Sequence, residues 1–208
     1  MNRLITICLL VVLGTGSAAL ATTTNQIWYF STHEVMPVPN VVHNEYGSPH
    51  LKVDPGSGTG WQHVAEGRTG VWSLSGEIDV IIPNYPVLNP YKKITINLIW
   101  APGGVDPFMP DQPLVGVVGL DVPEHAVPVD EPVMEIVSII NDPLAGTPWV
   151  ASIYEIIIRP NPPKEWIAIK GDILVDELGI RTECVPEPAT IGLLGLGGLA
   201  LLRSRRKR

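Results

Sequence analysis

Twenty-one prolines are spread along the 208 residues of the chain, and they limit what it can fold into. Proline lacks a backbone N–H donor and costs about 3 kcal/mol inside a helix, so long helices are excluded from the middle of the chain. The prolines do not gather in one tract, which excludes a polyproline linker. Because 45% of the residues are hydrophobic, the chain has enough apolar side chains for a core.

Alternation of apolar and polar residues indicates strands. In residues 92–100, one face carries Ile94, Ile96, Leu98 and Trp100, and the other carries Thr95 and Asn97. Further runs of this kind are expected at 26–30, 50–53, 71–74, 77–82, 114–120, 133–140, 149–158, 166–170, 172–176 and 177–181. Loops rich in Pro, Gly, Asn and Asp separate these runs, so the predicted fold class is all-β, an antiparallel, jelly-roll-like β-sandwich. The runs 149–158 and 166–170, joined by the turn 159–163, are predicted to form a hairpin.

The N-terminal residues 1–21 have the three parts of a secretory signal peptide. Arg3 gives a positive start, and an apolar stretch follows from Leu4 to Leu13. The small residues that end at Ala21 form a cleavage site, so cleavage is predicted between Ala21 and Thr22. We expect a signal helix at 1–21 and a mature sandwich domain at 22–184.

Residues 185–208 combine three features in a fixed order. The segment Val185-Pro186-Glu187-Pro188-Ala189-Thr190 is extended because of its two prolines. An uncharged, glycine-rich stretch within 190–202 is expected to form a short transmembrane helix. The end, 203–208, stays on the cytoplasmic side because it carries five positive charges, on Arg203, Arg205, Arg206, Lys207 and Arg208.

This order closely resembles the PEP-CTERM sorting signal. The resemblance implies a protein that is exported across the inner membrane, held in the membrane for a time by its tail, and processed near Pro186-Glu187-Pro188 by an exosortase. It also implies a final place on the cell surface or in an extracellular, exopolysaccharide-containing matrix. Twelve apolar residues span about 18 Å, less than the roughly 30 Å of a bilayer core, which suits temporary anchorage.

The charge of the predicted mature domain limits its partners. Residues 22–184 contain eight basic and 20 acidic residues, a net charge of −12. Such a domain repels phosphate backbones, so nucleic acid is excluded as a partner.

The mature domain shows no sequence motif for catalysis. The loop from Asp54 to Gly60 carries the oxygen donors that calcium prefers, but it lacks the repeated aspartates of an EF-hand loop, so a flexible turn is the favoured interpretation and calcium the alternative. The five histidines include no pair at i, i+4 spacing, and no Gly-x-Ser-x-Gly elbow occurs. Glu77 and Asp79 share one strand face, but a glycosidase pair depends on a distance across a cleft. Cys184 is the one cysteine of 22–184 and is expected to be an ordinary residue near the end of the fold. We therefore predict no enzyme, no metal and no cofactor.

Tryptophans are the candidates for ligand binding. Trp100, Trp149 and Trp166 lie in strand patterns and are expected in the core. Trp28 and Trp61 border polar or glycine-rich segments and are the candidates for exposed, ligand-binding rings. The pattern of the central domain is loosely similar to jelly-roll carbohydrate-binding modules. The sequence thus predicts a non-catalytic surface or matrix protein. A polysaccharide-binding module is the first alternative, and a secreted hydrolase is the less favoured one.

Overall fold

The computed structural model describes residues 22–84, 86, 91–104, 112–121, 127–128, 133–140 and 148–185. These residues form thirteen strands, and Thr22–Val185 is one compact unit. Within these ranges, no helix is long and apolar enough to cross a membrane. The predicted helices at 1–21 and 190–202 lie outside the described residues. The predicted all-β class is confirmed.

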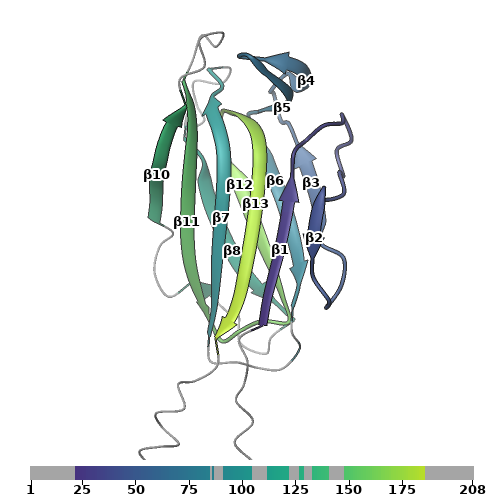
Figure 1. The fold of residues 1–208 in the computed structure, drawn as a ribbon, viewed down its shortest axis with the longest axis vertical. Coiled ribbons are helices and arrows are strands. Elements are labelled where there is room, and N and C mark those ends of the chain that lie inside the picture. Colours follow the sequence, from purple (N-terminus) through teal and green to yellow (C-terminus); the bar gives the residue numbers. More distant parts are fainter. Residues whose placement is uncertain are drawn as a thin grey trace, which may run out of the picture. The chain divides into compact units, whose positions relative to one another are not determined.

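The strands form two antiparallel sheets that lie face to face (Figure 1). The path of the larger sheet is β10 (Val133–Ile140), β11 (Trp149–Arg159), β7 (Tyr91–Pro102), β13 (Ile173–Val185), β1 (Thr22–Trp28) and β2 (Val41–His43). Beside this path, β4 (Gly60–Ala65) pairs with β5 (Arg68–Leu74), β5 pairs with β13, and β9 (Val127–Pro128) pairs with β11. The smaller sheet has the order β3 (His50–Asp54), β6 (Glu77–Pro83), β12 (Lys164–Lys170) and β8 (Leu114–Leu120). The predicted antiparallel sandwich is confirmed.

The predicted hairpin between 149–158 and 166–170 is wrong. β11 pairs with β7 and β10 in the larger sheet, whereas β12 pairs with β6 and β8 in the smaller one. The connection contains Pro160, Pro162 and Pro163, which have no N–H to donate to a ladder. The chain therefore crosses between the sheets here.

The core lies between the two sheets. The face predicted from residues 92–100 is confirmed, because Ile94, Ile96, Leu98 and Trp100 are all at most 3% exposed. The smaller sheet packs the inward side chains of β6 and β12 into the same core. Burial of each large aliphatic side chain contributes about 1.5–3 kcal/mol, so the sandwich has a core of its own and we expect Thr22–Val185 to fold independently.

An ion pair crosses this core. Lys92 Nζ on β7 donates to Glu165 Oε2 on β12 at 3.0 Å, and both side chains are fully buried. Each residue has the strand parity of its buried apolar neighbours, Lys92 with Ile94 and Glu165 with Ile167. The pair thus ties one sheet to the other through the apolar interior.

Glu165 is the less well satisfied partner. Its Oε1 has no hydrogen-bond partner within the part of the chain that the structure describes. Burial raises the pKa of the Glu165 carboxyl to about 7, an effect larger than the opposing attraction of Lys92.

Breaking this pair should be costly. Lys92→Met should lower the free energy of unfolding by about 3–5 kcal/mol, because it leaves a buried carboxyl without its partner. Adding Glu165→Leu should restore much of that loss. Lys93 is the matched control, since it lies on the same strand and pairs at the surface with Glu155; Lys93→Met should cost at most about 1 kcal/mol. Urea unfolding of the 22–185 segment measures all four proteins, and equal losses for the two lysine variants would contradict this role.

The raised pKa of Glu165 also predicts a pH dependence. Between its ordinary value of 4.5 and about 7, the folded protein holds a proton that the unfolded chain has lost. This group should therefore make stability fall as pH rises through that window, by at most about 1.4 kcal/mol per pH unit. Glu165→Gln should remove this part of the slope, which urea titrations from pH 4 to pH 8 detect as a difference between the two proteins.

Candidate functional site

The N-terminal part of β13 carries a β-bulge at Asp176. In its ladder with β7, Val175 lies opposite Trp100 and Glu177 lies opposite Ile99, so Asp176 has no partner position. The buried positions accordingly change parity, from Ile173 and Val175 to Leu178 and Ile180. A bulge turns a side chain away from the regular alternation, and here it directs Asp176 toward the β4–β5 hairpin.

A two-residue turn joins β4 to β5. Glu66 and Gly67 have φ values of 47° and 78°, as a type I′ hairpin turn requires. Trp149 on β11 holds this turn in place, because its indole N–H donates to the Glu66 carbonyl at 2.9 Å. The guanidinium of Arg68 lies over the Trp149 ring, 5.0 Å from its centre, and forms an ion pair with Asp176.

The segment after β1 closes against the same hairpin. Phe30 adopts a φ of 44°, and its carbonyl accepts a hydrogen bond from the Trp61 indole N–H at 2.9 Å. On β5, Gly70 has a φ of 74°, and a Cβ at this position would lie 2.7 Å from the Phe30 oxygen. Gly70 therefore permits the close approach that holds Trp61 in place.

Together these elements form a hollow of about 340 Å³. It is lined by two aromatic rings, two hydroxyl groups, an imidazole, a glycine and a carboxylate, namely Tyr29, Trp61, Ser31, Thr69, His63, Gly70 and Asp176. Tyr29 is 44% exposed. The rings of His33 and His63 lie 6.0 Å and 5.9 Å from the Trp61 ring, centre to centre. The hollow thus offers flat apolar surface beside both hydrogen-bond donors and acceptors.

The charges around the hollow are largely compensated. Asp176 pairs with Arg68, whose side chain is less than a quarter exposed. Next to it, burial raises the pKa of the Glu177 carboxyl, and the negative charge of Asp176 adds to the effect. Among the lining residues in the described ranges, Asp176 is the one carboxylate. No group of three or more metal-binding side chains comes together in the described part of the chain.

The two tryptophans predicted to be exposed, Trp28 and Trp61, differ in burial. Trp28 is fully buried, and its indole N–H donates to the Pro37 carbonyl, so the expectation of an exposed ring is wrong there. It lies at an inward position of β1, and this strand parity outweighs its polar neighbours in the sequence. Trp61 lines the hollow and is half-buried, which fits its selection as a candidate.

The expectation for the strand tryptophans was right twice and wrong once. Trp100 and Trp149 are buried in the core, whereas Trp166 lies half-buried on the outer face of β12. Trp166 shares its parity with Lys164 and Lys170, both exposed, and this signal in the sequence identifies the outer face. No comparable pattern in the sequence indicates the two histidines beside Trp61, because their contacts depend on the hairpin.

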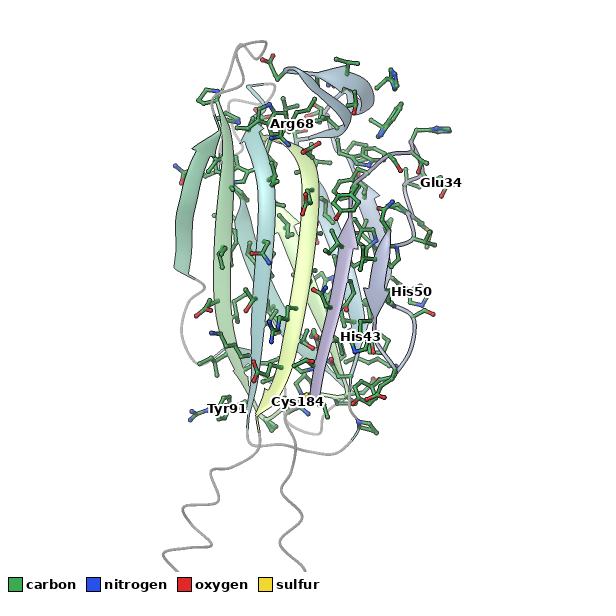
Figure 2. All side chains as sticks on the ribbon, viewed as in Figure 1. Glu34, His43, His50, Arg68, Tyr91 and Cys184 are labelled. Atoms are coloured by element: carbon green, nitrogen blue, oxygen red, sulfur yellow. The ribbon has the colours of Figure 1, made fainter. Side chains whose placement is uncertain are left out.

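The predicted sorting segment begins at the other end of β13. Val185 is the last residue of β13 and pairs with Tyr91. The neighbouring Cys184 is buried, and its Sγ lies 3.5 Å from Asn161 Oδ1. Figure 2 shows Arg68, which pairs with Asp176 of the hollow, at the opposite end of the sandwich from Tyr91 and Cys184. Nine residue steps separate Asp176 from Val185, about 30 Å of strand. Residues 186–190 and 203–208 lie outside the described residues.

Comparison with known proteins identifies the tail. Residues 185–207 match the PEP-CTERM protein-sorting motif, so the chain carries the signal of an exported protein that an exosortase sorts. No curated protein and no solved structure matches the chain. The likeness of the sandwich to jelly-roll carbohydrate-binding modules therefore stays a prediction.

Gly70 provides a test of how the hollow is built. Gly70→Ala should lower the free energy of unfolding by more than Gly60→Ala, because both positions have a positive φ but a Cβ at Gly60 meets nothing closer than 4.0 Å. We expect about 1–3 kcal/mol for the strain alone and a further loss for the contact with Phe30. Urea unfolding compares the two variants, and equal losses would mean that the Phe30 contact does not hold the hairpin.

Proposed function

We propose that this protein is a non-catalytic surface or matrix protein whose sandwich binds neutral polysaccharide in the Trp61 hollow. The hollow is the observation that supports this proposal most directly. Sugar rings present apolar C–H faces that stack on aromatic rings, and their hydroxyl groups both donate and accept hydrogen bonds. Trp61 and Tyr29 offer the first kind of contact, and Ser31, His63 and Asp176 offer the second.

Charge favours a neutral ligand. The net charge of −12 in residues 22–184 repels polymers that carry carboxylate or sulfate groups. The positive charge of Arg68 is already paired with Asp176, which lines the hollow. A neutral sugar avoids the cost of bringing a second anion to this surface.

The position of the hollow agrees with the sorting signal. The tail leaves the sandwich at Val185, about 30 Å of strand away from Asp176. The point of attachment is therefore distant along β13 from the residue of this strand that lines the hollow. After processing at the Pro186-Glu187-Pro188 segment, binding to polysaccharide would keep the released protein in the matrix.

The hydrolase alternative needs two carboxyl groups on either side of a glycosidic bond. Asp176 is tied to Arg68, and the pair Glu77 and Asp79 is also engaged: Glu77 pairs with Lys170, and Asp79 accepts the Trp166 indole N–H. These contacts favour the non-catalytic reading. Hydrolysis of any polysaccharide in a panel by the wild type, lost in Asp176→Asn or Glu77→Gln, would establish the alternative.

Trp61 gives the test of binding. Trp61→Ala should weaken binding to a neutral polysaccharide at least about tenfold, equivalent to 1.4 kcal/mol, because it removes the main stacking surface. Val64→Ala is the matched control, since Val64 lies on the same strand, is 59% exposed and does not line the hollow. A glycan array and titration calorimetry measure both variants. Equal binding by Trp61→Ala and the wild type would contradict the proposal.

The sorting signal has its own test. We expect mass spectrometry of the surface protein in its native host to find a C-terminus without the basic residues Arg203 to Arg208. Replacing both Pro186 and Pro188 by alanine should prevent processing, so that the tail is retained. Thr190→Ser is the control and should be processed like the wild type. A surface protein that retains Arg208 would contradict processing.

A further inference from the structure

A second hollow lies on the outer face of the smaller sheet, over strands β12 and β8. Its volume is about 440 Å³, and it shares no lining residue with the Trp61 hollow. Apart from Lys170, its lining is apolar and includes Leu114, Gly116 and Trp166. Leu114, which lines this hollow, is 58% exposed.

The Trp166 side chain is held before any ligand arrives. Its indole N–H donates to Asp79 Oδ1 on the neighbouring strand β6 at 2.8 Å. This hydrogen bond restricts the ring while leaving it half-exposed at the hollow. A ligand that stacks on the ring therefore binds a side chain that is already ordered, so little conformational entropy is lost on binding.

Gly116 keeps the space beside this ring open. A Cβ built on Gly116 meets no atom within 4 Å, and its φ lies outside the left-handed region. Neither backbone geometry nor crowding requires glycine here, although glycine weakens the interior of a strand. A glycine in such a position is typical of a site where another molecule approaches the backbone closely.

The residues around the hollow favour a small, ring-shaped ligand over a protein partner. Lys170 and Glu77 form an ion pair at 2.6 Å on the same face and supply a donor and an acceptor for hydroxyl groups. Ile81 on β6 lies opposite Trp166 and extends the apolar surface by one strand, but the outward positions of β3 carry His50, Lys52 and Asp54, so this surface ends before β3. A stable dimer needs about 800 Å² from each partner, and the charged outward residues of β3 limit the apolar surface on this face.

We propose that the Trp166 hollow is a second polysaccharide-binding site, which takes the apolar face of a sugar ring from a neutral polymer. This inference rests on the proposed function, since both sites bind the same class of ligand. Two separate sites on one sandwich bind two segments of polymer at once, which raises the overall affinity and lets one molecule cross-link two chains.

The test uses Gly116→Val in the full chain, solubilised in a mild detergent. Valine suits a strand and has room, so the unfolding midpoint should stay equal or rise, while the added methyl groups fill the hollow. Trp166→Ala is a second variant of the same hollow, so the site can still be tested if Gly116→Val does not fold. Val42→Thr on β2, 53% exposed and outside both hollows, is the control.

The readouts are affinity electrophoresis in galactomannan, glucomannan and hydroxyethyl cellulose, and light scattering of their mixtures with the protein. We expect the wild type to bind and to cross-link one or more of these polymers. Gly116→Val and Trp166→Ala should bind at least fivefold more weakly and should not cross-link, and Gly116→Val combined with Trp61→Ala should not bind.

The outcomes separate this inference from the proposed function. Full binding and cross-linking by folded Gly116→Val would overturn the second site, while a loss in Trp61→Ala would still support the first. A smaller particle for Gly116→Val than for the wild type in sedimentation, with unchanged binding, would assign this face to a second copy of the chain and overturn the inference. Absence of binding by the wild type would overturn both.

Discussion

The hydrogen-bonded ladders of β13 hold the larger sheet together. This strand pairs along its length with β7, with β1 over its C-terminal half and with β5 near its start. It therefore joins the start of the described chain, the centre of the larger sheet and the hairpin that carries Trp61. Its bulge forms one wall of the hollow, and its last residue begins the sorting motif. One strand thus sets both the site and the point of attachment, about 30 Å apart along the chain.

Much of the fold was predictable because strand alternation is a local property. Residues 92–100 show it clearly, and their buried face is the one that the sequence indicates. The same alternation places Lys92 and Glu165 inward and Trp166 outward, although we expected Trp166 in the core and made no prediction for the ion pair. At Trp28, too, strand parity outweighs the polar neighbours.

The pairing of strands was not predictable in the same way. The sequence does not say that β11 and β12 belong to different sheets, because sheet membership depends on contacts between residues far apart in the chain. The Trp61 hollow has the same origin: it needs the β13 bulge, the type I′ turn and the Phe30 contact at once. By contrast, the sorting motif at 185–207 was recognisable because its three parts follow one another directly.

The indole N–H signals of the six tryptophans report whether the sandwich binds neutral polysaccharide through its half-exposed aromatic rings. Four of them, Trp28, Trp72, Trp100 and Trp149, are at most 3% exposed. In a ¹H–¹⁵N spectrum of the 22–185 segment titrated with oligosaccharides of a neutral polymer that binds, the indole signals of Trp61 and Trp166 should move and those four should stay. Unmoved signals of Trp61 and Trp166, or shifts confined to residues near Tyr91 and Cys184, would rule out binding at these two rings.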